Sequence, residues 1–174
     1  MARLPYAAHD RADRKALVER IVKERGSVLH LYAMLLHSAP VAEGWLNYLT
    51  AIRQKSGLAG DIREMAIMRI AHLNGAPYEA EQHAPIALKE GMTQAQLDAL
   101  PDWKTASVFS KKQQAVLAYT DAMTRDIHVP DAVFDAMREH FDDEGVIELT
   151  ATIAAYNMVS RFLEALQIHS HDPL

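Results

Sequence analysis

Two glutamates and one histidine within residues 61–91 have the types and spacing that acid–base chemistry needs. Glu79 and His83 are four residues apart, so on a helix they lie one turn apart on the same face. Glu64 precedes apolar residues at spacings of three, four and seven, which places it on the apolar face of its own helix. A carboxylate turned inward needs a partner, because burying a lone charge is costly.

The two helices that carry these residues are separated only by a tight Asn-Gly-Ala-Pro turn at residues 74–77. A turn this short makes the helices neighbours, so we expect Glu64 and His83 to meet, with Glu79 beside them and Tyr78 nearby. Two carboxylates around an imidazole push the proton affinities of the three groups apart, which suits general acid–base catalysis. A histidine with a carboxylate behind it holds its proton to higher pH and can act as a proton donor.

Less specific interpretations of the same residues stay open. Glu79 and His83 can form a surface pair that stabilises the helix by about 0.2–0.5 kcal/mol. Glu64 can instead pair with Arg63, Arg69 or another arginine across an interface. The Glu-x-x-x-His spacing is also compatible with metal ligation, although no third and fourth ligand is evident in the sequence. The catalytic interpretation assigns acid–base roles to the Glu64, Glu79 and His83 side chains and expects no metal and no cofactor.

Four further side chains are candidates for contact with a substrate. Tyr78 follows the tight turn directly, and His72 lies two turns after Glu64 on the same helix. Trp45 belongs to an apolar helical stripe, a pattern that is also typical of a core or a subunit interface. Arg161 stands on an otherwise apolar helix, where it can hold a substrate carboxylate or form a structural pair.

Helix signals follow one another along the chain, and no alternating strand pattern interrupts them. Proline at first turns, glycine after last turns and capping boxes at 93–96 and 110–113 delimit the helices. We therefore predict an all-α fold of about eight helices. It has a helical lead-in at 1–39, one domain at 40–168 and a frayed tail at 169–174. The predicted helices are 12–25, 28–37, 40–55, 62–74, 77–90, 94–99, 110–124, 130–141 and 144–167, with a connection at 101–109.

Composition excludes several classes of protein. The chain has 174 residues, enough for one domain, and its 18 Lys and Arg against 23 Asp and Glu argue against nucleic-acid or anionic membrane partners. No apolar run approaches the roughly 18 residues of a membrane span, and the first residues lack an apolar leader, so we expect a cytoplasmic protein. The absence of cysteine excludes disulfides, cysteine-ligated metals and thiol chemistry in this chain.

The segment from Arg63 to His83, REMAIMRIAHLNGAPYEAEQH, resembles the carboxymuconolactone decarboxylase and alkylhydroperoxidase D family. The resemblance covers roughly residues 40–168, and further matching residues lie at 115–126 and 148–161. It implies the all-helical fold of that family and a homo-oligomer, either a trimer or a hexamer.

This chain departs from the peroxidase branch of the family at the residues that carry its chemistry. In that branch a Glu is followed by a Cys-x-x-Cys pair and a His, and the two cysteine positions fall on Ala76 and Glu79 here. The decarboxylase branch carries Glu and His four residues apart without cysteines, as Glu79 and His83 are. Tyr78 stands where that branch has an acidic residue, which is a departure from the pattern of the lactone-specific enzymes.

The resemblance implies a cofactor-free lyase or related proton-transfer enzyme, with His83 as general acid and base. Its substrate would be a small carboxylated or lactone-like molecule. Two alternatives stay open at this point. One is an antioxidant relative of alkylhydroperoxidase D that lacks the catalytic cysteines. The other is a non-catalytic oligomeric protein that binds small molecules, in which Glu64 and His83 form a structural pair.

We predict that the protein does not reduce peroxides with any dithiol reductant, because a chain without cysteine cannot form a sulfenate. The measurement is peroxide consumption by metal-free protein, with and without the reductant. Turnover that depends on the dithiol would contradict the prediction.

Overall fold

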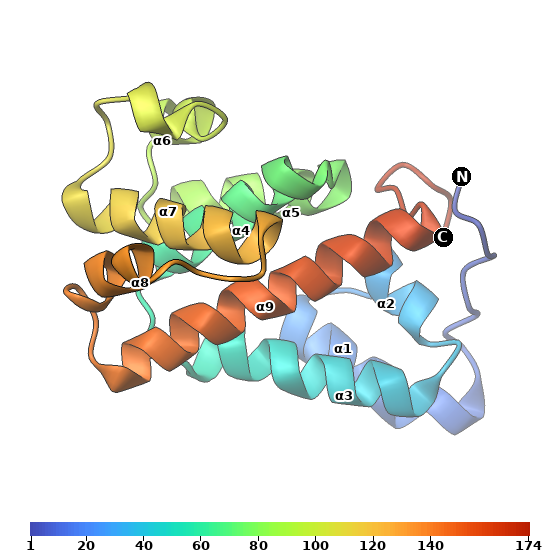
Figure 1. The fold of residues 1–174 in the computed structure, drawn as a ribbon. Helices are drawn as coiled ribbons and strands as arrows, with labels where there is room; N and C mark the ends of the chain where they lie inside the picture. Colours follow the sequence, from blue (N-terminus) through green and yellow to red (C-terminus); the bar gives the residue numbers. More distant parts are fainter. The chain divides into compact units, whose positions relative to one another are not determined.

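The computed structural model describes residues 1–174 and contains nine α-helices and no strands, so the prediction of an all-α fold is confirmed (Figure 1). None of these helices is both long and apolar enough to cross a lipid bilayer. The chain divides into two compact units, one of residues 1–56 and 163–174 and the other of residues 57–162.

The first unit contains three helices and both chain termini. A 3₁₀ turn (Ala12–Arg14) leads into α1 (Lys15–Arg25), which is followed by α2 (His30–Leu35) and α3 (Ala39–Thr50). The α1 and α2 helices pack on α3, which continues as a π-helical turn (Ala51–Lys55). Arg25 holds the three helices together, because its guanidinium donates to the Tyr32 hydroxyl at 3.1 Å and to the Thr50 hydroxyl at 2.8 Å.

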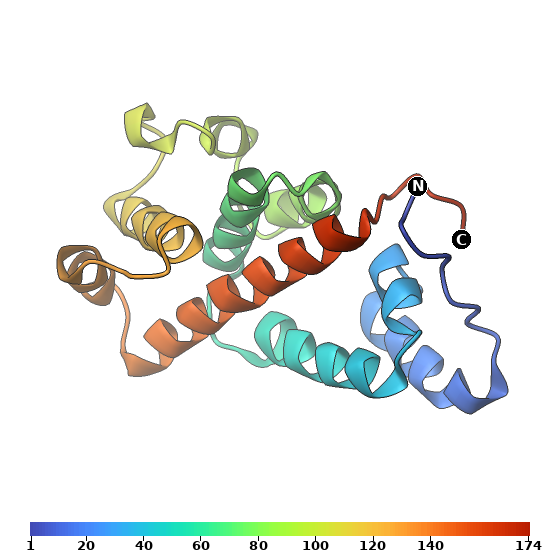
Figure 2. The ribbon, with the colours of Figure 1, turned by 45° about the vertical axis from the view of Figure 1, so that its right-hand side comes forward.

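The second unit is built around α4 (Gly60–Asn74) and α5 (Pro77–Lys89), which form the helical hairpin expected from the tight turn (Figures 1 and 2). After it come α6 (Gln94–Ala99), a 3₁₀ turn (Trp103–Thr105), α7 (Lys111–Arg125) and α8 (Asp131–Arg138). The long α9 (Asp143–Leu166) lies in this unit up to residue 162. The α4 helix packs against both α5 and α7, and α7 packs against α8.

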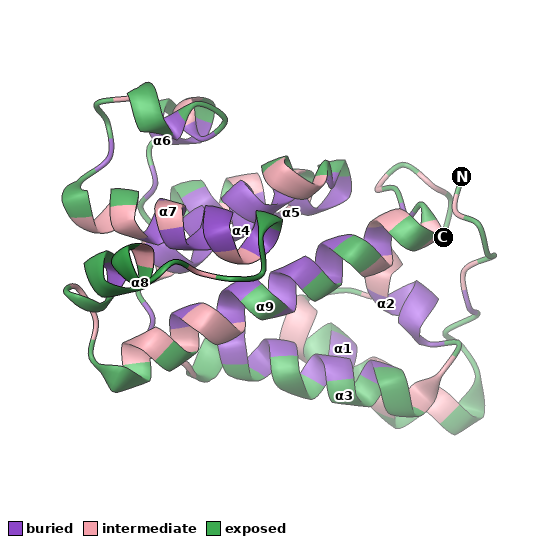
Figure 3. Cartoon of the chain, in the orientation of Figure 1, coloured by how far each residue is buried: buried purple, intermediate pink, exposed green.

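The α4 helix is buried along almost its whole length, from Ile62 to Ala71 (Figure 3). Met65 and Met68 on α4 pack in one cluster with Leu100, Trp103 and Leu117 from the following segments. The helix ends where Gly75 adopts a left-handed conformation with φ of 62°, which an L side chain rarely adopts, and Pro77 then opens α5. This core fixes the side of the hairpin on which each polar residue lies.

Both predicted capping boxes are present, at Thr93 with Gln96 and at Ser110 with Gln113. The chain enters the final helix through Asp142, whose carboxylate accepts a hydrogen bond from the Gly145 N–H at 2.8 Å. Serine and aspartate at these positions satisfy N–H groups that have no partner within the helix.

The structure corrects several predicted helix boundaries. The helix expected at 28–37 is only His30–Leu35, because Leu29 is extended and supplies no side-chain cap. The helix expected at 40–55 is α-helical only to Thr50, and the connection expected at 101–109 contains a 3₁₀ turn.

The tail that we expected to fray is held in the first unit. The Asp172 carboxylate accepts hydrogen bonds from the Ala2 N–H at 3.1 Å and from the Tyr6 hydroxyl at 2.8 Å. Ile168 is also buried, so both polar and apolar contacts fix this segment.

Candidate active site

Glu64 on α4 and His83 on α5 meet across the helical hairpin. The Nδ1–H of His83 donates a hydrogen bond to Glu64 Oε2 at 2.7 Å. Glu64 is 0% exposed and His83 is 7% exposed. A charge-assisted hydrogen bond of this length is roughly twice as strong as a neutral one, and burial shields it from water. The pair therefore holds the imidazole in one orientation.

Arg63 occupies the other oxygen of the same carboxylate. Its Nε donates to Glu64 Oε1 at 3.1 Å, and its guanidinium also lies 3.7 Å from the Glu90 carboxylate. Burial by itself raises the pKa of Glu64, but the hydrogen bond and charge of His83 together with Arg63 outweigh it, so the pKa of Glu64 is lowered. Glu64 is therefore held as a carboxylate, and each of its two oxygens accepts a hydrogen bond.

Glu79 lies one turn before His83 on α5 and is 2% exposed. Its Oε2 accepts a hydrogen bond of 2.6 Å from the hydroxyl of Ser160 on α9. The same hydroxyl lies 3.0 Å from the carbonyl oxygen of Tyr156. The Tyr156 ring also stands edge-on to the His83 imidazole, with centroids 5.0 Å apart and planes at 89°. The α9 helix therefore contacts both Glu79 and His83.

The remaining predicted site residues lie in different surroundings. Tyr78 is buried on α5, and Trp45 is buried on α3 in the first unit. His72 is exposed at the end of α4. Arg161 is exposed on α9, where it donates to the carbonyl oxygen and to the side-chain oxygen of Asn157. Among the predicted site residues, Glu64 and His83 are joined by a direct hydrogen bond.

The sequence analysis did not identify Ser160 and Tyr156. They are four residues apart on α9, and Ser160 is 81 positions from Glu79. Their spacing on a helix suggests a shared face, but nothing in it indicates which of the other helices that face meets. A buried serine on an apolar helix is the one signal that the sequence offered.

The hydrogen bond to Glu64 fixes what His83 can do chemically. Because Nδ1 carries the proton donated to the carboxylate, Nε2 is the nitrogen that can exchange a proton with another molecule. No three His, Cys, Asp or Glu side chains of the chain are grouped in a way that would hold a metal ion. The arrangement has the parts of a general acid–base site, in which a carboxylate orients an imidazole.

The fold and the site together define an all-helical protein built around a buried glutamate–histidine pair on two consecutive helices. Residues 39–122 match the carboxymuconolactone decarboxylase family. This match spans the hairpin that carries Glu64, Glu79 and His83. The resemblance inferred from the 63–83 segment is therefore confirmed over these residues.

Two relatives from bacteria align over much of the chain. Uncharacterized protein YdfG of Bacillus subtilis (strain 168) is 26% identical over 115 residues, which are 65% of this chain and 78% of that protein. Uncharacterized protein YnjA of Escherichia coli (strain K12) is 29% identical over 129 residues, 72% of this chain and 66% of that protein.

A solved structure shares the fold over almost the whole chain. It is the alkylhydroperoxidase AhpD core of an uncharacterized peroxidase-related protein from Ralstonia eutropha JMP134, and the TM-score is 0.83 at 21% identity. The superposition covers 98% of this chain and 93% of that one. At this identity the likeness shows the fold, and the chemistry has to be argued from the residues of this chain.

We predict that Glu64→Gln reduces the acid dependence of stability. The pKa of Glu64 in the folded state lies below its ordinary value of 4.5, so the folded state binds fewer protons than the unfolded state in this range. The stabilisation is complete above pH 4.5 and is lost as the pH falls through the lowered folded value. Urea unfolding at a series of pH values should show a shallower acid limb in the variant. At neutral pH the variant should be less stable by about 1–3 kcal/mol.

The matched control is Glu139→Gln, which removes an exposed carboxylate at the end of α8. Its acid limb should follow that of the parent protein. Parallel acid limbs for Glu64→Gln and the parent protein would contradict the prediction.

Proposed function

We propose that the protein is a cofactor-free proton-transfer enzyme, a carboxy-lyase that acts on a small carboxylated or lactone-like substrate. The observation that carries the proposal is the 2.7 Å hydrogen bond from His83 Nδ1 to the buried Glu64 carboxylate. It gives His83 a defined tautomer and a counter-charge, both of which a general acid requires. The relation to the carboxymuconolactone decarboxylase family supports the class of substrate.

The proposed reaction begins with cleavage of the bond between the substrate carbon and its carboxylate. Carbon dioxide leaves, and the electron pair of that bond moves into the conjugated system, where the substrate carbonyl takes it up as a dienolate. His83 then donates the proton from Nε2 to carbon, a new C–H bond forms, and the imidazole is left neutral. Glu64 stabilises the charged imidazole before the transfer, and solvent returns the proton afterwards.

Glu79 lies next to His83, and its hydrogen bond with Ser160 can form whether the Glu79 carboxyl is ionised or protonated. A hydroxyl carries one proton, so Ser160 donates to the Glu79 carboxylate when Glu79 is ionised. When Glu79 is protonated, its own O–H can donate to Ser160, which then turns its proton to the Tyr156 carbonyl oxygen 3.0 Å away. The buried carboxyl therefore has a hydrogen-bond partner in both states, and Ser160 is a positioning residue in this proposal.

The other proposed contacts are with the substrate. Tyr78, His72, Trp45 and Arg161 are proposed as substrate-binding residues, and Arg161 is the one suited to a carboxylate. We also propose that the protein is cytoplasmic and forms a trimer or a hexamer. Ile147 and Met158 on α9 are 68% and 37% exposed, which is compatible with coverage by another subunit.

We predict that His83→Gln lowers the decarboxylation rate by about two to four orders of magnitude, the usual range for the loss of a general acid. Carboxymuconolactone is the first substrate to test, followed by other small unsaturated lactone acids, and the loss of substrate absorbance gives the rate. Circular dichroism should show that the variant keeps its helices.

His128→Gln is the matched control, because His128 is exposed and lies on the segment between α7 and α8. Its rate should equal that of the parent protein. If His83→Gln lowers only the melting temperature and leaves turnover unchanged, the pair is structural and the proposal is wrong. Ser160→Ala should retain the fold and change the pH profile of turnover, an effect that a purely structural role would not produce.

A further inference from the structure

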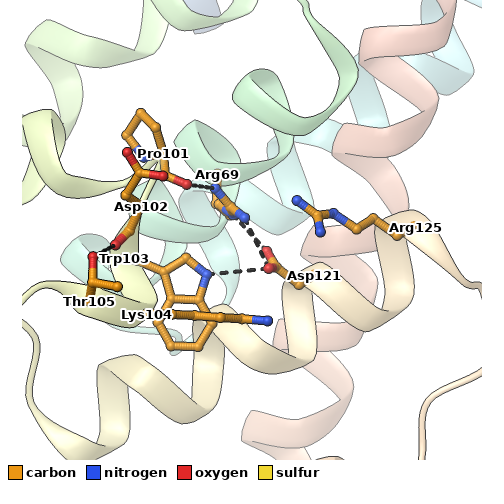
Figure 4. A pocket seen from close by; sticks show the side chains of 8 residues that line it. All are labelled: Arg69, Pro101, Asp102, Trp103, Lys104, Thr105, Asp121 and Arg125. Atoms are coloured by element: carbon orange, nitrogen blue, oxygen red, sulfur yellow. Dashed lines mark hydrogen bonds and ion pairs between the residues drawn. The ribbon is translucent and has the colours of Figure 1, made fainter.

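A pocket in the unit of residues 57–162 lies between the 3₁₀ turn after α6, the middle of α4 and the C-terminal half of α7 (Figure 4). Its volume is about 170 Å³. Its charged lining residues are Arg69, Asp102, Lys104, Asp121 and Arg125. None of the Glu64, Glu79 and His83 side chains lines it, so the pocket is separate from the candidate active site.

The floor of the pocket is a buried ion pair between Arg69 and Asp121, whose charges balance each other. Arg69 donates from Nε and from one terminal nitrogen to the two oxygens of Asp121, at 2.6 and 2.9 Å. Its other terminal nitrogen donates to the carbonyl oxygens of Leu100 and Pro101, at 2.8 and 3.1 Å. The indole N–H of Trp103 also reaches the Asp121 carboxylate, at 3.3 Å. The positive charge of Arg69 is therefore balanced within the floor.

The two other cations that line the pocket, Arg125 and Lys104, have no paired carboxylate. Figure 4 shows the guanidinium of Arg125 directed from α7 toward the Arg69–Asp121 pair, with the Lys104 ammonium approaching from the 3₁₀ turn. Neither cation forms an ion pair within 4 Å, and the Asp102 carboxylate at the rim pairs with neither of them. Counted over the lining residues, three cations face two carboxylates, which leaves one net positive charge.

A separate local interaction favours each of the two cations, Arg125 and Lys104, at the place where it lies. Arg125 is in the last turn of α7, where a cation is favoured by the helix dipole, and Lys104 lies 5.7 Å from the centre of the Trp103 ring. Those causes act on one side chain at a time. They do not require the two charged groups to converge on one cavity above a neutralised floor, where an anion would meet both of them.

We propose that this pocket binds a small oxyanion, the carboxylate or phosphate group of a small molecule, between Arg125 and Lys104. Arg125 would donate two parallel hydrogen bonds and Lys104 would contribute a point charge. The pocket volume of about 170 Å³ is well above the roughly 10–15 Å³ that a single water molecule requires, so a small oxyanion fits within it. The rigid Arg69–Asp121–Trp103 floor shapes the cavity and needs no rearrangement when the anion enters.

The test uses the indole N–H of Trp103 as the reporter. The chain has two tryptophans, so a proton–nitrogen NMR spectrum has two indole signals, and Trp45→Phe identifies the one from Trp103. Sodium phosphate and sodium acetate are titrated separately into the unmodified protein, with the ionic strength held constant by sodium chloride. We expect a saturable shift of the Trp103 signal and none of the Trp45 signal, and the tighter of the two anions identifies the preferred group.

Arg125→Gln and Lys104→Gln should each raise the apparent Kd about tenfold, and the double variant should show no saturation. Both side chains are exposed, so the variants are expected to fold. Lys111→Gln, which removes one exposed positive charge at the start of α7 outside the pocket, should bind like the parent protein. The absence of a saturable shift with both anions would overturn the proposal, and so would equal affinity in Arg125→Gln and the parent protein.

Discussion

The hydrogen bond between His83 and Glu64 is the interaction on which the arrangement of the candidate site depends. An unpaired carboxylate at full burial costs several kcal/mol, and an unpaired imidazolium costs a similar amount, so each side chain lowers the cost of burying the other. The pair joins α4 to α5 within the hairpin and sets the imidazole at a fixed angle. Arg63 completes it by occupying the second oxygen of the carboxylate.

The same principle governs the other buried charges of the α4 helix. Arg63 pairs with Glu64, and Arg69 pairs with Asp121, so each buried charge of this helix has a counter-charge within hydrogen-bond reach. The two pairs have different structural roles. The Glu64 pair orients an imidazole on α5, whereas the Arg69 pair joins α4 to α7 and to the loop after α6. A helix buried on all sides can therefore carry two separate polar centres.

Periodicity and turn chemistry were sufficient to predict the order of the helices and the hairpin, but not every helix boundary. The Asn74–Pro77 turn and the capping residues Thr93 and Ser110 act through local hydrogen bonds and backbone preferences, which are properties of short segments. The contact of Glu64 with His83 followed from two helices joined by such a turn. The contact between Glu79 and Ser160 did not, because it depends on how α9 packs against α5, which no local pattern encodes.

Burial was harder to infer than helix position. The sequence predicted that Glu64 lies on one apolar face, but α4 is enclosed on every side, so the burial of Arg63 and Arg69 did not follow from the amphipathic pattern. His72, by contrast, stands in the last turn of the same helix and is exposed. The difference arises from the helices that pack over the middle of α4 and leave its end uncovered.

The central claim is that Glu64 holds His83 with the proton on Nδ1 and leaves Nε2 to exchange protons. Nitrogen-15 NMR of the protein labelled at histidine measures this directly, because a protonated and an unprotonated imidazole nitrogen have widely separated chemical shifts. The account predicts that, in the neutral form of His83, Nδ1 carries the proton and Nε2 does not, and that Glu64→Gln weakens this preference. A neutral His83 with its proton on Nε2, unchanged by Glu64→Gln, would contradict it.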